Sequence, residues 1–304
     1  MKTLINKTLT GAVAMIASVA FGFAQTRTVE HEYSEFDAVS ASDGFKVTYV
    51  QDGAYKTSAT VDDAIESYVQ CYVKSKTLYI ELDEKSIPKE LKKQYKSKNA
   101  ADPVLEVTVY APSLNSITLS DDCVFTASKT LNADKFSVSV ADNSSISNLN
   151  VVAKSATLSA AKKSKLSSIH VTADDEITVN GDGNGTVILE YSCKKLDVNN
   201  AGSAELTVNG QADKIEAATA GSAKLTLSGK TSSLKVTGKG NSSKIDASGL
   251  SVETVEASFD AADLTVSPSK TLSLDLGKGA TVNYGGDPQI RIVKIQNASV
   301  LRSK

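Results

Sequence analysis

The hydrophobic and polar positions of this chain follow a repeat of about twenty residues. It is clearest in residues 201–208 and 220–227, where a glycine-serine pair precedes alternating polar and apolar residues. Aligning the repeats on their central apolar residue gives spacings of 22, 20, 21, 19, 19, 20, 19 and 18 between Val124, Ile146, Leu166, Val187, Leu206, Leu225, Ile245, Leu264 and Val282. Such regular spacing without helical periodicity predicts an all-β solenoid of short strands in coils of about 20 residues.

Two further positions in each repeat define the expected coil. The residue two places before the central one is small in every repeat except the first, where it is Asp122. A second apolar pair follows in most repeats, as in Leu196 with Val198 and Ile215 with Ala217. Each coil therefore has at least two faces. Stacked coils form a parallel β-helix, and the general preference of parallel crossovers predicts right-handed winding.

The N-terminal portion differs in composition but is also rich in strands. Eight of the ten tyrosines precede Ala111. Two alternating runs between residues 68 and 82 flank a short turn and predict a strand pair. Tyr72 and Tyr79 fall on the face opposite Cys71, where they either pack across the strands, the favoured interpretation, or form a platform for stacking a sugar.

One segment of this portion has helical periodicity. Ile87, Leu91 and Tyr95 recur every four residues between positions 85 and 98, among six lysines. This pattern predicts a short amphipathic helix within a lysine-rich insertion, residues 85–102. A solvated helical insertion is the favoured interpretation. The alternative is a cationic patch for anionic polysaccharide or lipid headgroups, made by Lys89, Lys92, Lys93 and Lys96.

The beginning of the chain has the pattern of a secretory signal peptide. Lys2 and Lys7 precede an apolar run that ends in small residues, which predicts a signal peptide over residues 1–24. No later segment is apolar enough to span a membrane. We therefore predict an exported protein, in the periplasm, on the outer cell surface or outside the cell. An N-terminal β portion over residues 25–112 precedes the repetitive solenoid, residues 113–304, whose apolar stretch 290–301 is expected to cap the C-terminal end.

Composition argues against several classes of function. The formal net charge of −2 gives the whole protein no attraction to nucleic acid. Two histidines leave almost no material for a zinc site or a histidine-based catalytic triad. The three cysteines lack metal-ligand spacing and are interpreted as buried thiols. The sequence indicates no catalytic residue, cofactor or metal, and leaves the oligomeric state open.

An acidic corner is the best candidate for local chemistry. Asp121 and Asp122 stand at one turn, and Asp142 stands at nearly the same phase one coil later. Carbohydrate-active β-helix enzymes use paired carboxylates on an outer face, so these residues support an enzyme as the alternative hypothesis. A solvated corner is favoured, because the arginines that a polysaccharide lyase would use are absent nearby. The calcium-like run at residues 181–185 occurs once and is interpreted as a loop.

Several short motifs, in this order, resemble the GIN-type domain family, the head of adhesin-type autotransporters. They are the run Phe-Asp-Ala-Val at 36–39, the junction at 110–117, the glycine-serine corners at Gly202 and Gly221, and the closing run at 282–288. The resemblance implies a secreted β-helix-like fold in the cell envelope of a Gram-negative bacterium. Earlier corners lack the family's glycines and are expected to bend differently.

These observations favour a non-enzymatic protein of the cell envelope, an adhesin-like or scaffolding solenoid. Its expected partners are envelope or host glycans or proteins. The alternatives are a carbohydrate-active enzyme and a polysaccharide-binding module.

Overall fold

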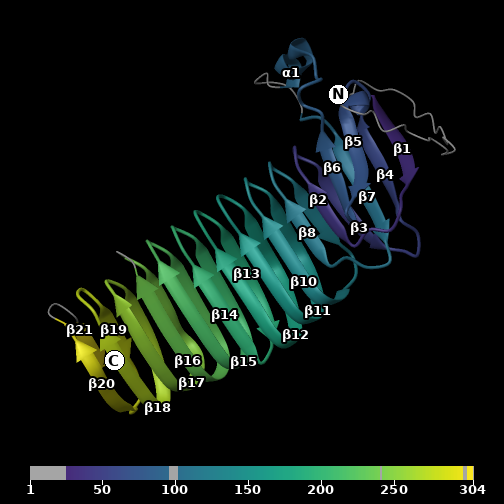
Figure 1. The fold of residues 1–304 in the computed structure, drawn as a ribbon. Helices are drawn as coiled ribbons and strands as arrows, with labels where there is room; N and C mark the ends of the chain where they lie inside the picture. The colour runs from purple at the N-terminus through teal and green to yellow at the C-terminus, as the bar shows by residue number, and fades with distance from the viewer. Residues whose placement is uncertain (1–24, 96–101, 240–241, 297–299, 304) are drawn as a thin grey trace, which may run out of the picture.

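The protein is a long β-solenoid whose coils stack along one axis (Figure 1). The structure, a computed structural model, describes residues 25–95, 102–239, 242–296 and 300–303. The predicted signal peptide lies outside these residues. The two ends of the described chain lie at opposite ends of the stack, as Figure 1 shows. The predicted all-β solenoid with coils of about 20 residues is confirmed.

The N-terminal portion contains β1 (Thr26–Glu32), β2 (Ala38–Ala41), β3 (Lys46–Gln51), β4 (Lys56–Asp62), η1 (Glu66–Tyr68), β5 (Val69–Lys74), β6 (Thr77–Leu82), α1 (Lys89–Tyr95) and β7 (Leu105–Ala111). The repetitive portion contains β8 (Ser116–Leu119), β9 (Val124–Ala127), β10 (Leu131–Val140), β11 (Ser145–Ala160), β12 (Lys165–Gly181), β13 (Thr186–Ser192), β14 (Lys195–Asn200), β15 (Glu205–Ala220), β16 (Lys224–Lys239), β17 (Lys244–Asp260), β18 (Asp263–Leu276), β19 (Thr281–Tyr284), β20 (Gln289–Ile295) and β21 (Val300–Ser303).

The strands form two hydrogen-bonded ladders, because most coils consist of one long strand whose two halves pair separately. The first ladder runs through β1, β4, β7, β3, β9, the first halves of the long strands, β13, β19 and β21. The second ladder runs through β5, β6, β2, β8, the second halves of the long strands, β14 and β20. The predicted short strands are thus mostly joined into strands of 14–17 residues.

The register confirms the predicted interior column in every coil except the first. The central residues of the later coils lie opposite one another in successive coils and are buried: Ile146, Leu166, Val187, Leu206, Leu225, Ile245, Leu264 and Val282. In the first coil, however, Phe125 and not Val124 pairs with Ile146. This shift by one residue moves Cys123 into the small corner position in place of Asp122, and so removes the exception in the sequence repeat.

The small corner positions are buried and their hydroxyl groups are hydrogen-bonded. The backbone N–H of Cys123 donates to Ser144 Oγ at 3.0 Å, and Ser164 Oγ donates to the carbonyl of Val140 at 2.8 Å. Buried hydroxyls are costly unless they are paired. Serine therefore fits these interior positions because the neighbouring coil supplies a partner.

The corners bend in two ways, as expected from the missing glycines. Early corners place two consecutive residues in the left-handed region, at Asp43–Gly44, Asp121–Asp122 and Asp142–Asn143. From Lys162 onward, a corner of this kind has one such residue, as at Gly183, Gly202 and Gly221. Asp and Asn tolerate this conformation better than most residues. At Asp121–Asp122 and Asp142–Asn143, aspartate and asparagine therefore adopt the conformation that glycine adopts at the later corners Gly183, Gly202 and Gly221.

The N-terminal portion confirms the predicted strand pair and part of the predicted helix. Strands β5 and β6 are antiparallel, and Tyr72 stacks on Tyr79 with ring centroids 5.2 Å apart and planes inclined by 13°. Helix α1 is shorter than predicted, but Leu91 and Tyr95 pack against the core. The Tyr95 hydroxyl donates to Asp62 Oδ2 at 2.8 Å, which ties the helix to β4.

The stretch that was expected to cap the C-terminal end is partly packed against the core and partly exposed. Strands β20 and β21 form the last coil, and Ile292, Val293 and Ile295 remain exposed. Ile290 and Leu301 in the described part of this stretch pack against the core, so the last coil extends the stack and covers its end only in part.

Candidate functional site

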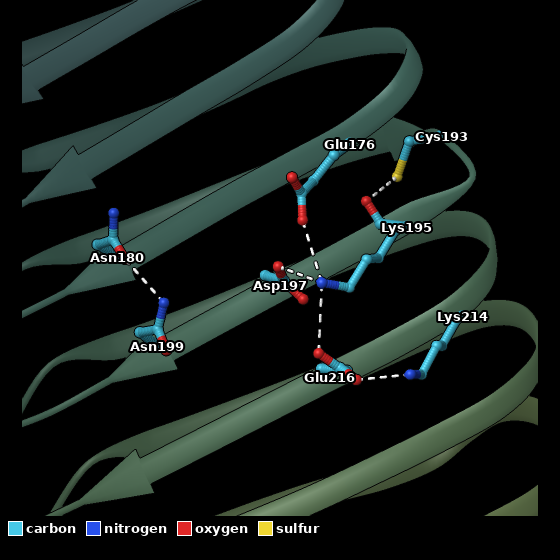
Figure 2. A network of polar contacts seen from close by, with 8 residues as sticks. All are labelled: Glu176, Asn180, Cys193, Lys195, Asp197, Asn199, Lys214 and Glu216. Carbon is cyan, nitrogen blue, oxygen red and sulfur yellow. Dashed lines mark hydrogen bonds and ion pairs between the residues drawn. The ribbon is translucent and has the colours of Figure 1, made fainter.

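A network of charged side chains joins β12, β14 and β15 in the second ladder (Figure 2). These strands lie near the middle of the stack (Figure 1). Glu176 on β12 lies opposite Lys195 on β14, which lies opposite Lys214 on β15. Asp197 and Glu216 are paired in the same way two residues further along β14 and β15. Because alternate residues of a strand face outward, the register places all five side chains on one surface.

Lys195 is the centre of this cluster. Its Nζ lies 2.7 Å from Asp197 Oδ2, 3.1 Å from Glu176 Oε1 and 3.3 Å from Glu216 Oε2. Lys214 Nζ lies 2.6 Å from Glu216 Oε1. Three carboxylates thus share two ammonium groups, and the network spans three coils.

The network perturbs the protonation of its members. Hydrogen bonds to Asp197 and Glu176 raise the pKa of Lys195 above its ordinary value, so this side chain stays charged. Burial raises the pKa of Asp197, with a further contribution from Glu176. Interactions with Asp197 and Lys195 lower the pKa of Glu176. Asp197 Oδ1 is buried and has no hydrogen-bond partner.

A shallow hollow of about 310 Å³ adjoins the network. Its rim includes Thr178, Asp197, Asn199, Glu216 and Thr237, with Lys235 on the next coil. Ala218 lies in the hollow between Asn199 and Thr237 in the same outward column. The hollow exists because alanine interrupts a column of larger side chains.

An amide ladder continues from the hollow toward the N-terminal coils. Asn199 Nδ2 donates to Asn180 Oδ1 at 3.0 Å, and Asn180 Nδ2 donates to Ser159 Oγ at 3.1 Å. These side chains fix one another's positions through hydrogen bonds. Their backbone is in turn hydrogen-bonded to the coils on both sides. We define the polar surface as Thr178, Asn180, Asp197, Asn199, Glu216, Ala218, Lys235 and Thr237.

This arrangement offers hydrogen-bond donors and acceptors but no ready nucleophile or metal centre. In the described ranges, no group of three or more His, Cys, Asp or Glu side chains is arranged to hold a metal ion. The hydroxyl, amide and carboxylate groups of the polar surface can donate and accept hydrogen bonds to a ligand rich in hydroxyl groups.

The predicted acidic corner comes together in the structure, with a lysine beside it. Asp121, Asp122 and Asp142 line a hollow of about 350 Å³ together with Lys162 and Lys163. Lys162 Nζ lies 2.5 Å from Asp142 Oδ1. All three aspartates have positive φ, so their turn conformation accounts for their residue type.

The other predicted surface residues lie near the N-terminal end. Lys89 and Lys93 on α1 are exposed and Lys92 is half-buried, whereas Lys96 lies outside the described residues. Tyr72 and Tyr79 cover one ring face of each other, and the Tyr72 hydroxyl donates to Glu81 at 3.0 Å. This geometry favours cross-strand packing over an open stacking platform.

The three cysteines are free, but only Cys123 is buried, whereas Cys71 and Cys193 are half-buried. The prediction of free thiols is confirmed, and Cys71 and Cys193 pack against the core although they are not fully buried. Burial raises the pKa of Cys71 and Cys123 to about 12 and that of Cys193 to about 11. All three thiols are protonated at neutral pH. His170 lies 3.0 Å from Glu190 on the surface.

The charged network was not predicted, because the repeat was aligned only on its inward apolar and small residues. The signal is present: Glu176, Lys195 and Lys214 are each separated by 19 residues, the length of the local coil. An alignment of the outward residues at this spacing places the opposite charges side by side in neighbouring coils.

The fold and the polar surface define a β-solenoid that presents side chains on a rigid face. The family model described as "Putative auto-transporter adhesin, head GIN domain" matches residues 35–184 and 156–288. The chain belongs to this family, and the resemblance found in the sequence is confirmed.

Several solved structures are similar over nearly their whole length. A "putative adhesin" from Parabacteroides merdae has 16% identity and a TM-score of 0.46, covering 93% of this chain and 98% of that one. A "putative adhesin" from Parabacteroides distasonis has 19% identity and a TM-score of 0.48, covering 92% and 98%. A "putative lipid binding protein" from the same species has 17% identity and a TM-score of 0.46, covering 92% and 96%. No curated protein matches the chain.

Within the described part of the chain, no helix is long and apolar enough to cross a membrane.

Proposed function

We propose that this protein is an exported, adhesin-like solenoid that binds glycans of the envelope or of a host through the polar surface. Membership of an adhesin-type family supports the class of function. The hollow of about 310 Å³ at Ala218 is the observation that carries the site. Its volume is at the lower end of the range in which small-molecule sites are found.

The chemistry of the rim favours a sugar. Hydroxyl, amide and carboxylate groups from Thr178, Asn199 and Glu216 face the same space, and each can bond to sugar hydroxyls. Lys235 balances part of the negative charge, so the rim does not select strongly for a charged ligand. A neutral oligosaccharide running along the ladder could contact successive coils, which are spaced about 4.8 Å apart.

The rigidity of the rim side chains also supports the proposed glycan site. The amide ladder holds Asn199, and the lysine network holds Asp197 and Glu216, before a ligand arrives, which lowers the entropic cost of binding. The interactions are noncovalent, and the proposed role requires no catalytic step.

A glycan array probed with the mature protein tests the proposal, and Ala218→Tyr provides the decisive variant because it fills the hollow. Thr207→Tyr is the matched control, since Thr207 is exposed on the outward face of the first ladder. We expect Ala218→Tyr to abolish glycan binding and Thr207→Tyr to retain it. Equal binding by both variants, with unchanged thermal unfolding, would refute the site.

Export is tested separately by adding protease to intact cells that produce the protein. Digestion is expected if the solenoid acts in adhesion on the cell surface. Protection in intact cells combined with digestion after permeabilisation would instead place it in the periplasm.

A further inference from the structure

The C-terminal end of the solenoid exposes residues that occupy core positions. Ile292 lies opposite Leu274 in the register, and Ile295 lies opposite Leu276. The exposed fraction is 56% for Ile292 and 0% for Leu274. The column of apolar side chains therefore continues into the last coil, where no described strand covers it.

The N-terminal end presents a matching opening. A groove of about 560 Å³ lies at the edge strands β1 and β5. Its apolar lining is Val29, Ala59, Val61, Val69 and Cys71, and the remaining lining residues are polar or aromatic: His31, Glu32, Tyr33, Glu66, Gln70 and Tyr72. Strand β1 pairs with β4, and β5 pairs with β6. In the described chain, neither strand has a partner on its other side. Both ladders therefore end here with free backbone groups beside this groove.

The two ends differ in charge. Strands β20 and β21 carry Arg291, Lys294 and Arg302 and no carboxylate. The edge strands β1 and β5 as a whole carry Arg27 and Lys74 as well as Glu30 and Glu32. The lining of the groove itself includes Glu32 and Glu66 and no lysine or arginine, although Arg27 pairs with Glu66 at 3.5 Å. A basic end and an acidic groove attract each other, whereas two basic ends repel.

We propose that these ends bind each other in successive copies of the chain, so that the solenoid assembles head to tail. Strand β20 of one copy lies against β5 of the next, and β21 lies against β1, which continues both ladders across the junction. The apolar side chains of Ile292 and Ile295 enter the groove. Each chain has one end of each kind, so the contact is heterologous and produces linear oligomers.

The unpaired edges of the end strands support a second copy of the chain as the binding partner. Free strand edges beside apolar side chains are templates for pairing with another chain unless charge or shape prevents it. The charges on β20 and β21 oppose pairing with a second C-terminal end but favour pairing with the acidic N-terminal end. The proposal does not depend on the glycan site, which lies on the outward face of the middle coils.

Analytical ultracentrifugation of the mature full chain over a wide range of concentrations tests the assembly. The wild type is expected to form a concentration-dependent series of oligomers, and Ile292→Asp is expected to be monomeric. Ile188→Asp is the matched control, because Ile188 is 44% exposed but lies far from either end. It should assemble as the wild type does.

A mixing experiment distinguishes head-to-tail from tail-to-tail contacts. Val69→Asp places a charge in the N-terminal groove, and Ile292→Asp places one on the C-terminal edge. Each variant alone should be monomeric, whereas an equal mixture should form a dimer through the one intact interface and stop there.

Three outcomes would overturn the proposal. The first is a wild type that remains monomeric at every concentration. The second is a mixture that contains no dimer although circular dichroism shows both variants folded. The third is a Val69→Asp variant that dimerises alone, since that result would demonstrate pairing between two C-terminal ends.

Discussion

Replacement of Leu225 by alanine tests whether the interior column holds the solenoid together. Leu225 is 1% exposed and lies between Leu206 and Ile245 in adjacent coils. Hydrogen bonds to both neighbouring coils fix the local backbone, so the structure can collapse little around the missing atoms. A Leu-to-Ala change of this kind costs about 3–5 kcal/mol, because a cavity remains in addition to the lost transfer free energy.

Urea denaturation followed by circular dichroism measures this effect. With a slope of about 3 kcal/mol per molar urea, the midpoint should fall by at least ~1 M. Hydrogen exchange should show the loss of protection centred on β15, β16 and β17, since a solenoid couples mainly nearest neighbours. Thr226→Ala is the control, because Thr226 is the adjacent exposed residue. An unchanged midpoint for Leu225→Ala would refute the column as a source of stability.

Three further predictions concern the bends, the corners and the thiols. Gly210→Ala should lower the free energy of unfolding by about 2–3 kcal/mol, because its Cβ would lie 1.9 Å from the Tyr191 carbonyl oxygen. Gly53→Ala is the control: no atom lies near its Cβ, so thermal melting should show no loss of stability. Asp122→Gly should melt within a few degrees of the wild type, whereas Asp122→Val should lower the free energy of unfolding by about 1–2 kcal/mol, since a β-branched residue is strained at φ 64°. Equal melting temperatures of the two variants would contradict the role of the turn. Stability should fall as pH rises from 9 toward 12, because the Cys123 pKa of about 12 exceeds its ordinary value of 9.0, so the thiol ionises first in the unfolded chain. Urea titrations across this range should give a shallower fall for Cys123→Ala.

The inward half of the fold was predictable because it repeats. Residues such as Leu206 and Leu225 recur at a fixed spacing, and that spacing determines which side chains meet in the core. The prediction was wrong by one residue at Val124, where the glycine-serine corner is missing and Cys123 takes the small position. The aspartates that looked like a carboxylate cluster occupy the left-handed turn positions that glycine fills later.

The outward surface was harder to predict because its 19-residue spacings join residues of different charge, so they form no repeated residue type along the chain. The contacts of Lys195 with Glu176 and Glu216 can be predicted only if the exact number of residues in the local coil is known. A slip of one residue would turn these side chains to the other face of the strand. Gly210 could not be assigned a role either, because its requirement comes from the approach of the Tyr191 carbonyl in the preceding coil.

The two proposals use different parts of the same register, so they can be separated and can also reinforce each other. Ala218 is an outward gap in the middle of the stack, whereas Ile292 is an inward position left open at its end. Filling the gap with Ala218→Tyr leaves the end contacts unchanged, and Ile292→Asp leaves the hollow unchanged. An end-to-end assembly would repeat the same polar surface along one line. Repeated sites gain strength on a repetitive glycan through effective concentration, without any new contact within a single site. Weak binding at one hollow is therefore compatible with firm attachment of an assembled solenoid.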